Sequence, residues 1–89
     1  MARREFDDAS DWYDSQRAGL GAKFTRAVQD VLDAIAADPL RFPKVYLEAR
    51  EAQVSRYPYC VYYRDEGTRA VVISVFHTSR DPSVWQSRA

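Results

Sequence analysis

The residues best suited to chemistry lie in the segment VFHTSRDPSVW, from Val75 to Trp85, which contains the only histidine of the chain. A metal site would need two or more further histidine, cysteine or clustered carboxylate ligands, and one histidine with one cysteine does not supply them. His77 could instead act as a general base, contact a phosphate, or hold the end of a strand by hydrogen bonds. The strand-end interpretation is favoured, and Arg80 is the better candidate for a functional contact.

The lone cysteine, Cys60, rules out an intrachain disulfide and is typical of a reducing compartment. A Cys60–His77 nucleophilic pair is conceivable because the two residues fall on neighbouring predicted strands, but a free cysteine is more often a small buried apolar residue. The sequence contains no glycine-rich phosphate loop, paired-carboxylate motif or Ser-His-Asp arrangement. We therefore expect neither a metal nor a cofactor.

Arginines and tyrosines form a second candidate site on or beside the predicted sheet. Alternation places Tyr59, Val61 and Tyr63 on one face of their strand and the residues between them on the other. Arginine planes and aromatic faces can stack bases and bind phosphates, but tyrosines are also good strand formers with polar tips. The cluster comprises Arg50, Arg56, Tyr57, Tyr59, Tyr62, Tyr63, Arg64 and Arg80.

Length and charge restrict the class of protein. The chain has 89 residues, enough for one domain with a thin core. Its 13 Lys/Arg balance its 13 Asp/Glu, which argues against a surface built wholly for nucleic acid. The sequence shows neither a signal-peptide pattern nor an apolar run approaching about 18 residues, so we expect a soluble, cytoplasmic protein.

The first half is predicted to be helical. Apolar residues follow a helical period from Arg3 to Gln16, and the glycines of Arg17–Gly21 indicate a helix stop and a tight connection. A second helix should begin at Leu20 and end before Pro39, because the residue preceding a proline disfavours helix. Two helices joined by so short a turn form an antiparallel hairpin.

The second half is predicted to be a sheet that follows a connector, Pro39–Val45. Strands are expected at residues 52–57, 59–65 and 69–77, with a hairpin turn at residues 65–68 in which Gly67 needs a positive φ. Helices on one face of an antiparallel sheet make an α+β domain.

Alternation and the tryptophans give further expectations. Strict alternation in the last strand would place His77 on the face of Ile73 and Val75 and opposite to Phe76. Trp12 and Trp85 are both expected to pack, with Trp85 covering part of the sheet, although it could equally be an exposed anchor for a partner.

Four motifs in order resemble one family. They are the helical hairpin WY…R.GLG..F, the connector I..DP.RFP, the strands R…V.RYPY.VYYR and the ending V.H..RDP..W. Together they resemble the RelE/ParE toxin superfamily from Ala2 to Arg88, and more closely its ParE, or plasmid-stabilisation, branch. The resemblance implies a single ParE-like toxin domain over residues 1–89.

The implied fold is α+β, an N-terminal αα-hairpin packed on one face of a three- to four-stranded antiparallel sheet. The family normally begins with a short strand, whereas MARREFDD enters the first helix at once. In this fold that strand would pair beside the last one, near His77. Its loss would leave an open edge that invites self-association or strand addition by an antitoxin segment.

The implied function is that of the toxin in a type II toxin–antitoxin pair, neutralised by a cognate ParD-type antitoxin that carries a DNA-binding end. ParE-branch toxins are associated with DNA gyrase, whereas RelE-branch toxins cut mRNA in the ribosome, and the shared scaffold does not decide between them. The neutral charge and the absence of lysine after Lys44 favour a gyrase inhibitor that is not itself a catalyst. The alternative is a RelE-like ribosome-dependent mRNA endoribonuclease. We expect no membrane association, and nucleic-acid contact only through the antitoxin complex.

The resemblance also suggests three sets of site residues. The set expected to bind the target is Arg56, Tyr59, Arg64, His77, Arg80 and Trp85. The set expected to bind the antitoxin is Trp12, Tyr13, Leu20, Phe24 and Val28. If the protein is a nuclease, the catalytic set would be Arg56, Tyr62, Tyr63, His77 and Arg80.

Overall fold

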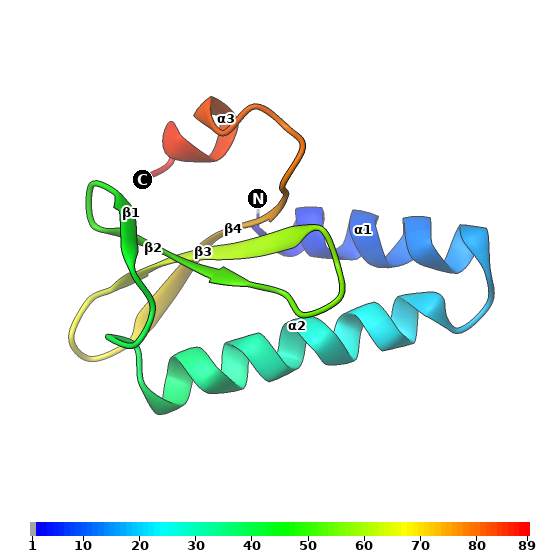
Figure 1. Cartoon of the computed structure of the whole chain (residues 1–89), viewed down its shortest axis with the longest axis horizontal. Coiled ribbons are helices and arrows are strands. Elements are labelled where there is room, and N and C mark those ends of the chain that lie inside the picture. Colours follow the sequence, from blue (N-terminus) through cyan, green and yellow to red (C-terminus); the bar gives the residue numbers. More distant parts are fainter. Residues whose placement is uncertain (1) are drawn as a thin grey trace.

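The computed structural model describes residues 2–89, which form two long helices, a four-stranded antiparallel sheet and a short C-terminal helix (Figure 1). The predicted α+β fold, with an N-terminal helical hairpin against an antiparallel sheet, is confirmed. The elements are α1 (Ala2–Gln16), α2 (Leu20–Ala37), β1 (Lys44–Tyr46), β2 (Ala49–Gln53), β3 (Tyr59–Asp65), β4 (Ala70–His77) and α3 (Ser83–Gln86).

Glycines set the tight connection between α1 and α2. Gly19 adopts φ +90°, a left-handed conformation that favours glycine, and α2 begins at the next residue. Gly21 is buried where the helices meet, and a Cβ there would lie 2.6 Å from the carbonyl oxygen of Ser10. Its N–H donates to Asp14 Oδ1 at 2.7 Å, which supplies a partner for one of the unpaired amides at the start of α2. The predicted hairpin therefore closes at the predicted place.

The main core lies between the helical hairpin and the sheet. Phe24 is its centre, with its ring 6.0 Å from that of Phe6 and 5.0 Å from those of Tyr13 and Tyr59. These aromatic contacts join α1, α2 and β3. The buried residues of this main core are Ala9, Phe24, Val28, Val31, Ile35, Ala52, Val54, Val61, Tyr63 and Val75.

A second, smaller core lies on the opposite face of the sheet, where α3 packs (Figure 1). Trp85 of α3 is 2% exposed and stacks on Tyr62, with ring centroids 3.7 Å apart and planes 11° apart. The expectation that Trp85 covers part of the sheet is confirmed. Ala49, Cys60, Ile73 and Phe76 complete this cluster.

The strands follow the order β1-β2-β3-β4, and each neighbouring pair is antiparallel. Among residues 2–89, no strand pairs with the outer edge of β4, where the resemblance placed an additional strand. The N-terminal part of α1 lies against β4, and Glu5 accepts hydrogen bonds from Ser74 Oγ and Arg88 Nη1, both at 2.9 Å. Glu5 thus joins α1, β4 and the C-terminal segment.

Two strand predictions were wrong in position. The connector predicted at Pro39–Val45 ends earlier, because Lys44–Tyr46 form β1, and the turn after this strand places Leu47 at φ +51°. The strand expected at residues 52–57 instead runs from Ala49 to Gln53, and the chain turns at residues 54–58. In this turn the N–H of Tyr57 donates to the carbonyl of Val54 at 3.4 Å, and Arg56 adopts φ +70°.

Strict alternation in the last strand was wrong at Ile73, whereas His77 does share the face of Val75 and lies opposite to Phe76. Tyr62 pairs with Ser74 and Tyr63 pairs with Val72, so Ile73 is an extra residue in a β-bulge. The bulge places Val72 and Val75 toward the helices, whereas Ile73 and Phe76 join the opposite cluster. The alternation predicted for Tyr59, Val61 and Tyr63 in the neighbouring strand is confirmed, and Gly67 has the expected positive φ, +85°.

Candidate functional site

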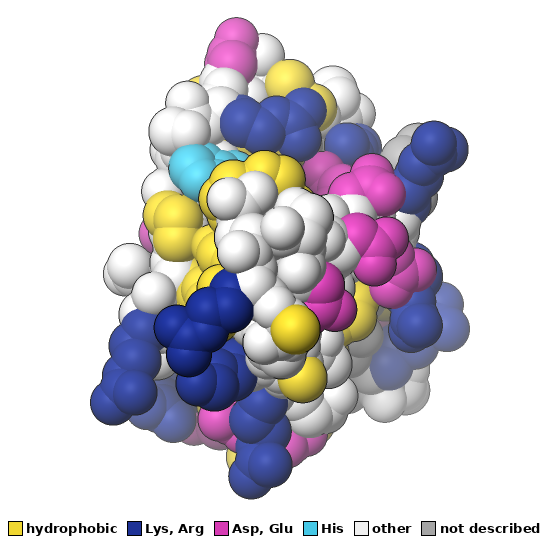
Figure 2. Space-filling view, turned by 90° about the vertical axis from the view of Figure 1, so that its right-hand side faces the viewer, with side chains coloured by type: hydrophobic (Ala, Val, Ile, Leu, Met, Phe, Trp, Pro, Cys, Tyr) yellow, Lys and Arg dark blue, Asp and Glu magenta, His cyan; other side chains and the backbone are white. Residues whose placement is uncertain are grey.

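One candidate surface lies where α1 passes the end of β4, and we call it the β4-end surface: Trp12, Tyr59, His77 and Arg80. These four side chains border a shallow cavity of about 250 Å³, together with Glu5, Asp8, Ala9 and Val75. Figure 2 shows the histidine of this surface beside hydrophobic side chains. The structure therefore joins three residues from the predicted target-binding set to one from the predicted antitoxin-binding set.

His77 is held at the end of β4 by its own turn. Its Nδ1 accepts the backbone N–H of Ser79 at 3.1 Å and lies 2.7 Å from Ser79 Oγ. An Nδ1 that accepts an N–H leaves Nε2 to carry the ring proton of the neutral imidazole. The ring also packs edge-on against Tyr59, with centroids 5.0 Å apart. These contacts agree with the predicted hydrogen-bonded strand-end residue.

Arg80 presents a charge at the same place. Its N–H donates to the carbonyl of His77 at 3.2 Å, and its guanidinium lies over the Phe76 ring, 4.8 Å from the centroid. The side chain is exposed and forms no ion pair within residues 2–89. An arginine fixed over an aromatic ring with its donors free is suited to recognising a carboxylate or phosphate.

Trp12 contributes an exposed aromatic ring. It is 56% exposed and touches Tyr13 edge-on, with centroids 5.0 Å apart. The expectation that Trp12 packs like Trp85 was wrong, because Trp12 is an exposed side chain at the border of the cavity. Exposed tryptophan beside arginine and tyrosine has the composition of an energetically important protein contact.

The residues proposed for a nuclease are not all brought to one place, because Tyr62 and Arg80 border one cavity and His77 and Arg80 border another. Tyr63 is fully buried on the helix side and donates to the carbonyl oxygen of Pro39 at 2.6 Å. Tyr62 faces the other side, under Trp85, and donates to Glu51 Oε2 at 2.8 Å. Burial raises the pKa of both phenols, so neither is suited to proton transfer near neutral pH. Arg56 lies in the β2–β3 turn and borders a different groove from His77 and Arg80.

Cys60 has the properties of a buried apolar residue. It is 5% exposed, packs in the cluster beneath α3, and burial raises the pKa of its thiol. It pairs with Phe76 across the sheet, whereas His77 lies beside Tyr59 toward the helices. The Cys60–His77 nucleophilic pair is therefore not formed.

Of the other predicted target-binding residues, Arg64 lies apart from the β4-end surface, whereas Trp85 borders a separate cavity that Arg80 also borders. Arg64 Nη2 pairs with Glu66 Oε2 at 3.0 Å near the β3–β4 turn. Trp85 is buried against the sheet and presents almost no surface to a partner.

The predicted antitoxin-binding set is divided by burial. Phe24 and Val28 are 0% and 1% exposed, so they cannot contact a partner while the helical hairpin is packed. Tyr13 and Leu20 are half-buried, and Trp12 is the exposed member. The helical period identified Phe24 and Val28 as an apolar face, but that face is turned toward the sheet.

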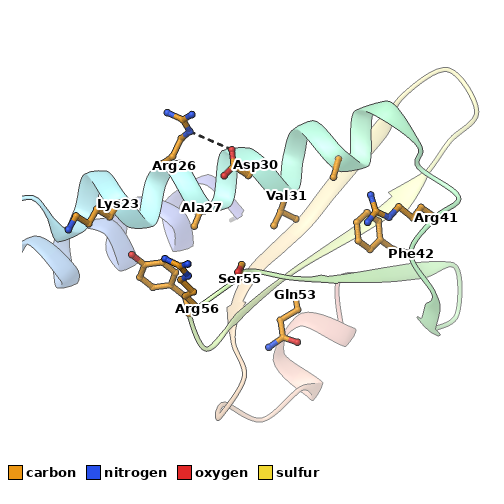
Figure 3. Close-up of a pocket in the computed structure, with 12 residues that line it drawn as sticks. Lys23, Arg26, Ala27, Asp30, Val31, Arg41, Phe42, Gln53, Ser55 and Arg56 are labelled. Atoms are coloured by element: carbon orange, nitrogen blue, oxygen red, sulfur yellow. Dashed lines mark ion pairs between the residues drawn. The ribbon is translucent and has the colours of Figure 1, made fainter.

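A groove between α2 and β2, which we call the α2–β2 groove, was missed by the sequence analysis. It has a volume of about 610 Å³, and Figure 3 shows its walls. Lys23, Arg26 and Arg56 each border it, and Figure 2 shows Lys and Arg side chains gathered at the lower left of the molecular face. The available signal was the pair of cations one helical turn apart on α2, but the sequence alone did not indicate that Arg56 would join them.

Two further findings concern metal ions and membranes. Within residues 2–89, no three His, Cys, Asp or Glu side chains gather so that they could hold a metal ion. No helix in the same range is long and apolar enough to cross a membrane.

The fold defines a class of small α+β proteins in which a helical hairpin covers one face of a four-stranded antiparallel sheet. Within that class, the family model described as the ParE toxin of the type II toxin–antitoxin system parDE matches residues 1–82. The chain belongs to this family, and membership implies a cognate ParD antitoxin. Among curated proteins, none matches the chain.

Proposed function

We propose that this ParE toxin inhibits DNA gyrase through its β4-end surface and that its ParD antitoxin neutralises it by covering the same surface. The observation that carries the proposal is the convergence of Trp12, Tyr59, His77 and Arg80 around one cavity. Aromatic residues and arginine dominate the energetics of protein–protein contacts. A binding role for this surface needs no catalytic group.

The separation of the nuclease candidates supports a binder over an endoribonuclease. Tyr62 and Tyr63 are 7% and 0% exposed and face opposite sides of the sheet. Acid–base catalysis requires groups within hydrogen-bonding reach of one scissile bond, and this arrangement does not provide them. The stack of Trp85 on Tyr62 also fills the sheet face that α3 covers.

A shared surface gives a simple mechanism of neutralisation. Trp12 on α1 and Arg80 after β4 border the same cavity, so a partner bound to one side chain would cover the other. Two partners that need one surface exclude each other by mass action. The antitoxin would then act by competition, with no conformational change required in the toxin.

The first test measures both candidate activities with purified toxin. We expect the toxin to inhibit negative supercoiling by purified gyrase, and ParD to restore it. In cells, DNA synthesis should fail before protein synthesis within minutes of induction. Early collapse of protein synthesis, together with ribosome-dependent mRNA cleavage by the purified toxin, would refute the proposal and favour the nuclease.

Variants identify the surface. Arg80→Glu reverses the free charge and should weaken both gyrase inhibition and ParD binding by at least tenfold. His77→Ala should only weaken inhibition, because a binder does not depend on proton transfer by that ring. Arg69→Glu is the control at a distance, since Arg69 is 75% exposed and lies at the far end of the sheet near the β3–β4 turn, with its Nε 3.6 Å from Glu66 Oε1. Equal loss in Arg80→Glu and Arg69→Glu would show that the β4-end surface is not the contact.

A further inference from the structure

Three hydrogen-bond donors that lack a protein acceptor border the cavity of the β4-end surface. Within residues 2–89, the guanidinium of Arg80, Nε2 of His77 and the hydroxyl of Tyr59 form neither a hydrogen bond nor an ion pair. Nε2 carries the proton of the neutral imidazole because Nδ1 accepts from Ser79. Each of the three groups can donate, so a ligand that pairs with all of them is an acceptor.

The donors are held in place by contacts within the toxin. The backbone N–H of Arg80 donates to the carbonyl of His77 at 3.2 Å, and the guanidinium lies 4.8 Å from the centroid of the Phe76 ring. The imidazole packs edge-on against the ring of Tyr59, with centroids 5.0 Å apart. Side chains that are already fixed lose little conformational freedom when a ligand binds, so the donors are prepared for one.

The charge of Arg80 favours an anion at this place. Burial raises the pKa of the Tyr59 phenol above its ordinary value, and the guanidinium of Arg80 opposes part of that rise. A guanidinium that stabilises a tyrosinate also stabilises a bound anion beside the same oxygen. Because Arg80 pairs with no carboxylate in the part of the chain that the structure describes, its charge is available to a ligand.

The cavity has the size of a site for one side chain. Its volume is about 250 Å³, whereas sites that enclose a whole small molecule measure roughly 300–1,000 Å³. The two oxygens of a carboxylate can accept from the fork of Arg80 and still have lone pairs for Nε2 of His77 and the hydroxyl of Tyr59. The exposed ring of Trp12 borders the same cavity and offers an apolar contact to the stem of such a side chain.

We propose that Arg80, His77 and Tyr59 together bind the carboxylate of one aspartate or glutamate side chain of a protein partner. The inference rests on the proposed role of the β4-end surface as a protein contact, and it names the chemical group that this surface recognises. Arg80 supplies the charge and a paired set of donors, while Nε2–H and the phenol fix the direction of the carboxylate.

Acidic residues of α1 favour a protein carboxylate over the phosphates of DNA. Asp8 borders the same cavity, is exposed, and forms no ion pair within residues 2–89. The helix as a whole carries two arginines against five acidic residues. A DNA backbone brings several phosphates, and those next to the bound one would meet this acidic helix, whereas a protein brings a single carboxylate. Asp8 therefore acts as a specificity residue that disfavours phosphate.

The test uses the full-length toxin and capped tripeptides with a central glutamate, glutamine or phosphoserine between two leucines. His77 is the only histidine of the chain, so the NMR signals of its ring report binding without ambiguity. The glutamate peptide should shift these signals saturably, and the glutamine peptide should bind at least about tenfold more weakly because it lacks the charge. The phosphoserine peptide should bind more weakly than the glutamate peptide, and Asp8→Asn should strengthen it about threefold.

Matched variants locate the site. Arg80→Gln should weaken the glutamate peptide at least about tenfold, and Arg80→Lys, which keeps the charge but loses the fork, should retain part of the affinity. Arg56→Gln is the control, because Arg56 is also exposed and without an ion pair within residues 2–89 but borders the α2–β2 groove. Tyr59→Phe should weaken binding about threefold. Tyr57→Phe removes a phenol outside this cavity and should have no effect.

Several results would overturn the carboxylate assignment. They are equal binding of the glutamine peptide, an Arg80→Gln variant that binds normally, and tighter binding of the phosphoserine peptide or of a short DNA duplex at the His77 signals. Gyrase inhibition by the same wild-type toxin separates the two proposals. Selective glutamate binding without inhibition refutes the gyrase function alone, whereas inhibition without glutamate selectivity refutes this inference alone.

Discussion

At the scale of single residues, Trp85 is expected to matter most for stability. Its indole is 2% exposed and stacked on Tyr62, so Trp85→Ala removes a buried ring and leaves a cavity. We expect the free energy of unfolding to fall by about 3 kcal/mol in urea denaturation. Trp12→Ala is the control, because that indole is 56% exposed and its loss should change stability by less than about 0.5 kcal/mol. Equal losses in the two variants would contradict the burial described for α3.

Arg56 is expected to store backbone strain. It adopts φ +70° in the β2–β3 turn, a conformation that costs a residue with a Cβ about 1 kcal/mol and costs glycine little. Arg56→Gly should therefore raise the free energy of unfolding by about 1 kcal/mol while removing a cation from the α2–β2 groove. Gly67→Ala is the opposite change at φ +85°, where a Cβ meets no neighbour within 4 Å, so its expected loss of about 1 kcal/mol reports the backbone alone. Thermal or urea unfolding measures both, and a destabilised Arg56→Gly would show that the arginine side chain outweighs the strain.

At the scale of elements, Glu5 is expected to tie α1, β4 and the C-terminal segment together. Its side chain is 15% exposed and accepts from Ser74 Oγ and Arg88 Nη1. Arg88→Ala removes one of the two hydrogen-bond donors to this half-buried carboxylate. We expect the free energy of unfolding to fall by about 1 kcal/mol. Hydrogen exchange of β4 amides should also accelerate. Arg69→Ala, at a 75% exposed position, is the control and should leave both quantities unchanged.

The helices could be predicted from the sequence because their boundaries depend on local signals. Gly19 and Pro39 are breakers, and a sustained apolar period marks the face of α2 between them. The first strand could not be predicted, since Lys44–Tyr46 is short and exposed throughout and carries no burial pattern. The end of β2 was missed because Arg56 occupies a left-handed position that sequence signals assign to glycine or asparagine.

The types of residue in the candidate site could be predicted from the sequence. Which of these residues lie together in the fold could be predicted only in part. His77 and Arg80 are close in sequence, so their proximity needed no tertiary information. Trp12 joins them only because α1 lies along β4, and no local pattern reports that contact. The bulge at Ile73 was equally hidden, because each residue around it is a good strand former and alternation cannot show which one is extra.

At the scale of the whole molecule, alkaline pH should test the two cores together. Burial is the largest cause that raises the pKa of four tyrosines above the ordinary value of 10.0: Tyr13, Tyr59, Tyr62 and Tyr63. Above about pH 10 the unfolded chain releases phenolic protons that the folded chain retains. The contribution of these tyrosines to the free energy of unfolding is therefore complete below about pH 10, and it is lost as the pH rises through the pKa values that they have in the folded chain.

We accordingly expect the free energy of unfolding to decline steadily from about pH 10 upward, with tyrosinate absorbance appearing late and together with loss of structure. Tyr62→Phe removes the phenol whose pKa is raised most strongly and should make the decline shallower, even though Glu51 loses the hydrogen bond from it. Tyr46→Phe is the control, because Tyr46 is an exposed residue of β1 and should leave the slope unchanged. A stability curve that stays flat in this range would mean that the four phenols ionise as freely in the folded chain as in the unfolded one, and both cores would then be more open than their burial indicates.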